Sequence, residues 1–210
     1  MGLINEGNFH VFVSGNTQSG KSTFTHRALL QIRGPVLYFN IQGERVPRGF
    51  MNVYSTDVDT EQLIEMLKDG MKINLIFSNP RTGYDYVAGH VMNAIMDAGF
   101  DDQHPVYVCI DECHLLKGYS LEIAKYVATA GLKKGQRLIC ITQRPALADK
   151  TLYTQAFEHY IFFIAAGDSA YMKSKGIDYD FCKAEWESRG KHSYCYYNGY
   201  QIEGRNPLTI

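Results

Sequence analysis

The feature that most constrains this chain is a glycine-rich stretch near its N-terminus that matches the pattern G-x-x-x-x-G-K-[ST]. It consists of Gly15, Asn16, Thr17, Gln18, Ser19, Gly20, Lys21 and Ser22, and Thr23 follows. An apolar run over residues 9–13 predicts a strand before the stretch, and residues 23–32 are compatible with a helix after it. Strand, glycine-rich loop and helix together predict a P-loop, in which backbone N–H groups and the helix N-terminus bind phosphate oxygens.

The P-loop pattern assigns roles to single residues. Gly15 and Gly20 permit backbone conformations and close approaches that a Cβ atom would obstruct. Lys21 is expected to reach the β- and γ-phosphates of a nucleoside triphosphate, and the Ser22 hydroxyl is expected to bind Mg²⁺. We therefore predict that residues 15–23 bind the nucleotide and that ATP and Mg²⁺ are the cofactors, although no base-reading motif separates ATP from GTP.

Length, charge and cysteine content limit the class of protein. The 210 residues predict a single domain, with a core at about 9–165 and a C-terminal extension at about 166–210. The net charge of −1 excludes a generally basic nucleic-acid binder, so contact with nucleic acid needs a local patch or a ring of patches made by several subunits. No run approaches the ~20 apolar residues of a membrane span, and no signal peptide is visible, so we expect no membrane insertion and a cytoplasmic location. The five cysteines include no C-x-x-C pair, which argues against zinc.

Strand-like and helix-like segments alternate along the chain. Strands are expected at residues 36–41, 50–54, 72–77, 106–110, 137–142 and 160–164, and helices at 57–67, 84–98, 121–130, 146–157 and 169–175. Asn198-Gly199 predicts a hairpin that pairs residues 192–197 with 201–203. Such alternation predicts an α/β fold, with a mainly parallel sheet flanked by helices on both faces and a C-terminal β-hairpin at its edge.

Two adjacent carboxylates follow the apolar run at residues 106–110, as in a Walker B strand. Asp111 is expected to hold the Mg²⁺ shell together with Ser22, through a bridging water. Because side chains alternate along a strand, Glu112 points elsewhere and suits a second role, which is to orient and deprotonate the water that attacks the γ-phosphate.

A third element is the apolar run at residues 138–142, which ends in Gln143. If this strand lies between the P-loop strand and the Walker B strand, the neutral amide of Gln143 comes close to the γ-phosphate. There it could hydrogen-bond the phosphate or the attacking water and report the state of the nucleotide. The three elements together define the RecA-like class of P-loop NTPases that has an additional strand and a catalytic glutamate.

The segments G-N-T-Q-S-G-K-S-T, C-I-D-E-C-H and I-T-Q-R-P resemble those of the FtsK–HerA superfamily of DNA-pumping motors. Within it, the chain looks most like the compact genome-packaging ATPases of tailless viruses with an internal membrane. The resemblance covers about residues 9–165. It implies ATP-driven translocation of double-stranded DNA, without sequence specificity, by a homo-oligomeric ring that is usually a hexamer. It also implies viral capsid or membrane-vertex proteins as partners, and the host cytoplasm or the virion as the location.

Ring ATPases place an arginine of one subunit against the γ-phosphate bound to its neighbour. Arg81, in the loop after a strand, is the first candidate for this trans arginine finger, and Arg144, beside Gln143, is the second. Arg45 and Arg48 come third. For DNA, the densest basic cluster is formed by Lys133, Lys134 and Arg137, although a solvated surface explains such a cluster equally well.

Two other classes of P-loop enzyme were weighed. Asp111, Glu112, Cys113 and His114 spell a DECH box, but a two-lobed helicase needs a second RecA-like half that 210 residues do not accommodate, so Cys113 and His114 are interpreted as incidental. A nucleotide or nucleoside kinase fits the length. It would usually carry an arginine-rich lid, which is not visible, and a glutamate directly after Walker B favours water as the acceptor.

Overall fold

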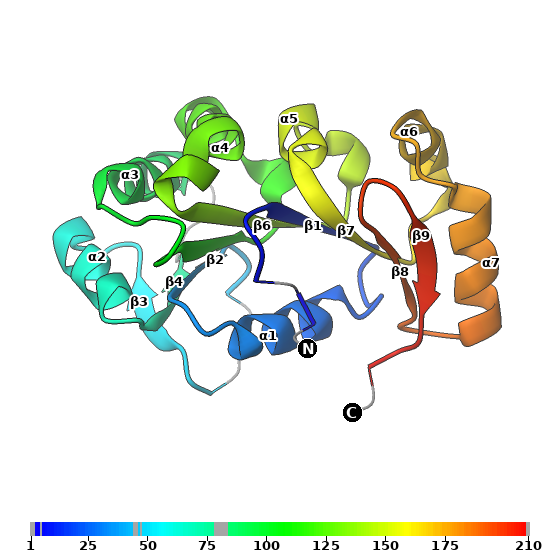
Figure 1. Ribbon diagram of the computed structural model, residues 1–210, viewed down its shortest axis with the longest axis horizontal. Helices are drawn as coiled ribbons and strands as arrows, with labels where there is room; N and C mark the ends of the chain where they lie inside the picture. Colours follow the sequence, from blue (N-terminus) through cyan, green and yellow to red (C-terminus); the bar gives the residue numbers. More distant parts are fainter. Residues whose placement is uncertain (1–2, 5, 44–45, 47, 78–83, 209–210) are drawn as a thin grey trace.

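The structure is a computed structural model that describes residues 3–4, 6–43, 46, 48–77 and 84–208. The strands of these residues form one sheet of nine strands in the order β3-β4-β2-β5-β6-β1-β7-β8-β9 (Figure 1). Seven of them pair in parallel, and β8 and β9 pair antiparallel at one edge. The predicted α/β fold with a C-terminal hairpin is confirmed.

The bounds of the strands are β1 His10–Ser14, β2 Val36–Asn40, β3 Met51–Tyr54, β4 Lys72–Ile76, β5 Val106–Ile110, β6 Gln136–Thr142, β7 Ala156–Phe162, β8 Tyr194–Tyr197 and β9 Ile202–Arg205. The helices are α1 Lys21–Gln31, α2 Thr60–Lys68, α3 Tyr84–Asp97, α4 Gly118–Ala130, α5 Lys150–Thr154, α6 Ser169–Ser174 and α7 Tyr179–Arg189. Most bounds lie within one to three residues of those expected from the sequence.

Two apolar layers cover the two faces of the sheet. Helices α3, α4 and α5 lie over one face and α1 lies under the other (Figure 1). Side chains of β1 divide between the layers, because Phe12 packs in the cluster of α3 and α4 whereas Val11 and Val13 pack with Phe24 and Leu29 of α1. This alternation explains why the strands read as continuous apolar runs: both faces of a parallel sheet are buried.

Two predictions about the chain after β6 were wrong in detail. The helix expected at 146–157 is only α5, preceded by a 3-10 turn over Pro145–Leu147, and β7 begins at Ala156 rather than at residue 160. The helix is short because Asp149 caps it through the Thr151 N–H at 2.7 Å and because pairing with β1 starts directly afterwards, with His10 opposite Ala156.

Helix α7 was not predicted. Its side chains Tyr179, Cys182 and Trp186 are buried, at a spacing that fits one helix face. Asp178 caps its start by accepting a 2.9 Å bond from the Phe181 N–H. With β8 and β9, α7 covers the sheet edge beyond β7 (Figure 1).

Candidate functional site

The P-loop connects β1 to α1 as predicted, and hydrogen bonds fix it to the strands on both sides of β1. The Gly15 N–H donates to the Thr142 carbonyl of β6 at 3.1 Å, and the Asn16 N–H donates to the Phe163 carbonyl after β7 at 2.7 Å. The Asn16 side chain accepts a further bond from the Ala165 N–H at 3.3 Å. The loop is therefore held in place before a ligand arrives.

Both glycines of the P-loop are required by their surroundings. A Cβ at Gly15 would lie 2.5 Å from the Cβ of Phe162, and Gly20 has a φ of +102°. Lys21 begins α1 and is only 7% exposed. The loop thus meets the conditions that the sequence predicted for binding phosphate at a helix N-terminus.

The order of the strands brings the three predicted elements together. Strand β6 lies between β1 and β5, as the interpretation of Gln143 required. The carboxyl ends of β1, β5 and β6 therefore present Gly15, Asp111 and Gln143 at one edge of the sheet. The contact is direct, because Thr17 Oγ1 donates a 2.5 Å hydrogen bond to Gln143 Oε1.

The two carboxylates after β5 are both buried, with Asp111 6% and Glu112 3% exposed. Asp111 Oδ1 accepts a bond from the Glu112 N–H at 3.0 Å. Glu112 adopts a left-handed backbone conformation with φ 49°, which is uncommon outside glycine and concentrates at functional sites. The two acids lie in the turn after β5, which ends at Ile110, so strand alternation does not set their directions.

Glu112 is held by Gln42 and His114, which sequence reasoning did not assign to the site, and by the backbone of Gln143. The Gln42 side-chain amide donates to Glu112 Oε1 at 2.8 Å, and the backbone N–H of Gln143 donates to Oε2 at 3.3 Å. His114 Nδ1 lies 3.2 Å from the same Oε2. The sequence offered no role for His114, and the structure places it beside Glu112, in the 3-10 turn over Cys113–Leu115.

These contacts decide the charge of Glu112. Burial raises its pKa, but the hydrogen bonds from His114 and Gln143 lower it, and the charge of Lys21 adds to the lowering. The net pKa of Glu112 lies below its ordinary value of 4.5, so the carboxylate is ionised at neutral pH and can accept a proton.

The residues present fit a magnesium ion. Among the described residues, no three His, Cys, Asp or Glu side chains gather as a protein-only metal cage would. Magnesium does not need one, because it is commonly bound by one or two carboxylates together with substrate phosphates and water. Asp111 supplies a buried carboxylate, and Ser22, in the first turn of α1, supplies a hydroxyl.

The candidates for the arginine finger and for DNA contact lie in different surroundings. Arg81 and Arg45 lie outside the described residues. Arg144 and Arg48 are exposed, and Arg144 directly follows Gln143. Lys133 and Lys134 are exposed in the turn before β6, at the amino ends of the strands, whereas the P-loop lies at their carboxyl ends.

The prediction that Arg137 contacts DNA was wrong. Arg137 is 5% exposed, donates to the Tyr107 hydroxyl at 3.1 Å, and lies with its guanidinium carbon 5.5 Å from the centre of the Tyr107 ring. Its side chain is part of the packing under the sheet, because position 137 falls inside β6 and not in the preceding turn.

The fold is similar to that of solved P-loop ATPases. The genome packaging NTPase B204 from Sulfolobus turreted icosahedral virus 2, solved with AMPPCP, has a TM-score of 0.74 at 15% identity, over 98% of this chain and 100% of that one. The bacterial conjugative coupling protein TrwB gives 0.65 at 11% identity, over 96% and 85% of the two chains. ATPases 2 and 3 of EssC from Geobacillus thermodenitrificans give 0.60 at 10% identity, over 97% and 40%.

These likenesses confirm the predicted fold, which is that of a RecA-like P-loop ATPase. No protein-family model matches the chain, and no curated protein sequence does. None of the described helices is both long enough and apolar enough to cross a membrane.

Proposed function

We propose that this chain is a Mg²⁺-dependent ATPase that drives double-stranded DNA into a viral capsid. The observation that carries the ATPase part is the meeting of the P-loop, Asp111, ionised Glu112 and Gln143 at the carboxyl ends of β1, β5 and β6. A carboxylate held with its proton-accepting oxygens fixed is what an attack by water on the γ-phosphate requires.

In the proposed reaction, Lys21 and the N–H groups of the P-loop bind the phosphates, and Gln143 orients the γ-phosphate or the attacking water. Glu112 takes a proton from that water while the oxygen of the water bonds to the γ-phosphorus. The bond from phosphorus to the bridging oxygen then breaks, and ADP leaves with the electron pair. Ser22 and Asp111 would hold Mg²⁺, which supplies positive charge against the phosphate oxygens.

The motor part of the proposal is supported by the fold. One of the similar structures is a genome packaging NTPase, and another is a conjugative coupling protein. A net charge of −1 suits a ring in which each subunit contributes a small basic patch, such as Lys133 and Lys134, to phosphate contacts that need no sequence readout. We propose a homo-oligomer, with a hexamer as the first expectation, that works in the host cytoplasm at a capsid vertex.

In a ring, an arginine of the neighbouring subunit would complete the site. Among the described arginines near the Gln143 end of β6, Arg144 is exposed and free to face a neighbouring subunit, while Arg81 remains the first candidate from the sequence. Mixing Arg81→Ala or Arg144→Ala subunits with Lys21→Ala subunits tests this. A trans arginine predicts partial recovery of hydrolysis in the mixture, because some interfaces then combine an intact P-loop with an intact arginine.

The decisive experiment is steady-state ATP hydrolysis by wild type and Glu112→Gln, with and without duplex DNA. We expect hydrolysis that duplex DNA stimulates, and a loss of at least about 10²-fold in Glu112→Gln with nucleotide binding retained. Phosphorylation of a nucleoside in place of hydrolysis would establish a kinase. Full hydrolysis by Glu112→Gln would remove Glu112 as the base.

A further inference from the structure

A groove follows the outer side of the P-loop, where the turn between α7 and β8 approaches it. Its two hollows, of about 310 Å³ and 230 Å³, share Gln18, Ser19, Lys191 and His192 as lining residues. The second also contains Lys21 and Ser22. A C-terminal turn for which the sequence offered no role therefore forms one wall of the predicted phosphate site.

The turn is seated on the P-loop by His192. A Cβ at Gly20 would lie 3.0 Å from His192 Nδ1 and 3.1 Å from its Cβ. His192 has a φ of 72°, in the left-handed region that non-glycine residues seldom occupy. The Ser193 hydroxyl and N–H both donate to the Gly190 carbonyl, at 2.7 Å and 3.2 Å, which closes the turn. Contact with the loop and internal bonding both fix its position.

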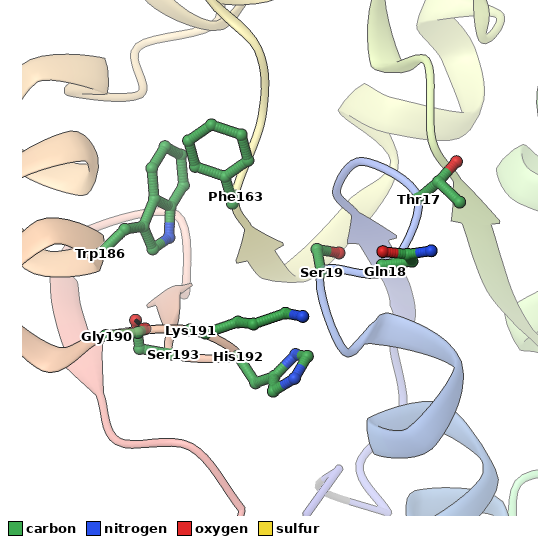
Figure 2. A pocket seen from close by; sticks show the side chains of 9 residues that line it. All are labelled: Thr17, Gln18, Ser19, Phe163, Trp186, Gly190, Lys191, His192 and Ser193. Carbon is green, nitrogen blue, oxygen red and sulfur yellow. Dashed lines mark hydrogen bonds between the residues drawn. The ribbon is translucent and has the colours of Figure 1, made fainter.

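Two residues that line this groove carry polar groups without a partner among the described residues. Figure 2 shows the Lys191 side chain extended from the turn towards the P-loop, with its ammonium end near Ser19. In the described part of the chain Lys191 forms no ion pair. Ser19 is only 6% exposed, and its hydroxyl has no hydrogen-bond partner among the described residues. A cation beside the N-terminus of α1, on one cavity, suits an anion.

The strand order gives the direction in which the nucleotide lies. Glu112 and Gln143 mark the γ-phosphate end, on the β6 side of β1, whereas β7 and β8 lie on its other side. The remainder of the nucleotide must leave the P-loop towards β7 and the α7–β8 turn. Phe163, which is half-exposed, lines the larger hollow together with Trp186 and Lys191 (Figure 2). The two aromatic rings provide an apolar wall for a base beside the Lys191 ammonium group.

We propose that the α7–β8 turn is a second phosphate-binding element of the nucleotide site, supplied by the same subunit as the P-loop. Lys191 binds the phosphate chain from outside the loop, and His192 is a positioning residue that holds the turn against Gly20. The class of ligand, a nucleoside triphosphate, rests on the proposed function. Binding of the phosphate chain by Lys191 rests on the groove itself.

The test measures equilibrium binding of AMPPCP and of inorganic tripolyphosphate, each with Mg²⁺, to the full chain. Lys191→Met keeps the length of the side chain without its charge, and we expect it to raise the Kd for both ligands about tenfold. Lys191→Arg is expected to restore binding to within about threefold of wild type. The matched control is Lys183→Met, which changes an exposed lysine of the preceding helix α7 and should bind as wild type does.

Unchanged binding by Lys191→Met would overturn the proposal, while wild-type binding of AMPPCP would leave the proposed function standing. No binding by wild type would instead defeat the proposed function. A loss for AMPPCP but not for tripolyphosphate would also overturn the proposal, since Lys191 would then contact the base or ribose. For His192, the glycine variant keeps the left-handed turn but removes the side chain that contacts Gly20, so it should bind about tenfold more weakly, whereas His192→Asn keeps the atoms next to Gly20 and should bind within about threefold of wild type. Equal binding by both would remove the positioning role.

Discussion

The side-chain amide of Gln42 donates a 2.8 Å hydrogen bond to Oε1 of Glu112, so the loop after β2 holds one oxygen of this carboxylate. The other oxygen, Oε2, is held at 3.2 Å by His114 and at 3.3 Å by the Gln143 N–H. Partners on both oxygens fix the plane of the carboxylate before any substrate binds. A carboxylate that is fixed in advance also has a fixed distance to the water from which it takes the proton.

Gln42→Ala should lower kcat for ATP hydrolysis about tenfold and leave KM within about twofold, because the carboxylate loses one fixed partner while the phosphate contacts stay intact. Steady-state kinetics at saturating Mg²⁺ measure both constants. Gln62→Ala, which changes an exposed glutamine on α2, is the matched control and should match wild type. A rise in kcat in Gln42→Ala would mean that Gln42 restrains Glu112 instead of orienting it.

Thr17→Val should lower kcat about three- to tenfold, because the 2.5 Å bond from Thr17 to the Gln143 amide oxygen is lost and the amide is free to turn away from the γ-phosphate position. Thr17→Ser keeps the hydroxyl and should retain most of the activity. Single-turnover hydrolysis separates this effect from product release. If valine and serine behave alike, the hydrogen bond has no part in the reaction.

The sequence was sufficient for the parts of the site that are contiguous in the chain. Gly15 to Ser22 and the pair Asp111-Glu112 carry their chemistry in a fixed local spacing. The sequence also offered a place for Gln143, on the condition that its strand lies between β1 and β5, and the strand order meets that condition. Local patterns are therefore readable when the strands are long apolar runs.

The partners of the site were not readable, because tertiary packing alone brings them in. Gln42 reaches Glu112 across 70 positions, and His192 reaches Gly20 from a turn after a helix that was not predicted. Nothing local distinguishes either residue from any other loop residue. Arg137 failed for the complementary reason: only the register of β6 beside β5 shows that it packs on Tyr107.

Experiments with DNA should distinguish the exposed lysines before β6, Lys133 and Lys134, from the buried Arg137 within it. Lys133→Glu/Lys134→Glu reverses two exposed charges and should weaken the stimulation of hydrolysis by duplex DNA, most strongly at low salt. Arg137→Met should leave that stimulation unchanged but lower the free energy of unfolding by about 1–3 kcal/mol, since the Tyr107 hydroxyl and the Asp102 carbonyl lose a donor. Loss of DNA stimulation in a stable Arg137→Met protein would contradict this division.

Acid should destabilise the fold through two buried histidines. His10 in β1 and His159 in β7 are 2% and 4% exposed, and burial lowers the pKa of each from 6.5 to about 4. His10 Nδ1 accepts a 2.9 Å bond from the Leu138 N–H, so a proton there would break a bond inside the sheet. The nearby charge of Arg137 lowers the pKa of His10 further.

Because the unfolded chain binds protons to these histidines from pH 6.5 downward and the folded chain does not until about pH 4, the stabilisation is complete above pH 6.5 and is lost as the pH falls towards 4. By pH 5 the expected loss is about 2 kcal/mol for each histidine. Urea unfolding at pH 7.5 and pH 5 measures it. His159→Phe keeps an aromatic ring among Phe12, Tyr153 and Tyr197 and should remove about half of the difference. An undiminished difference in His159→Phe would show that His159 is not a source of the acid sensitivity.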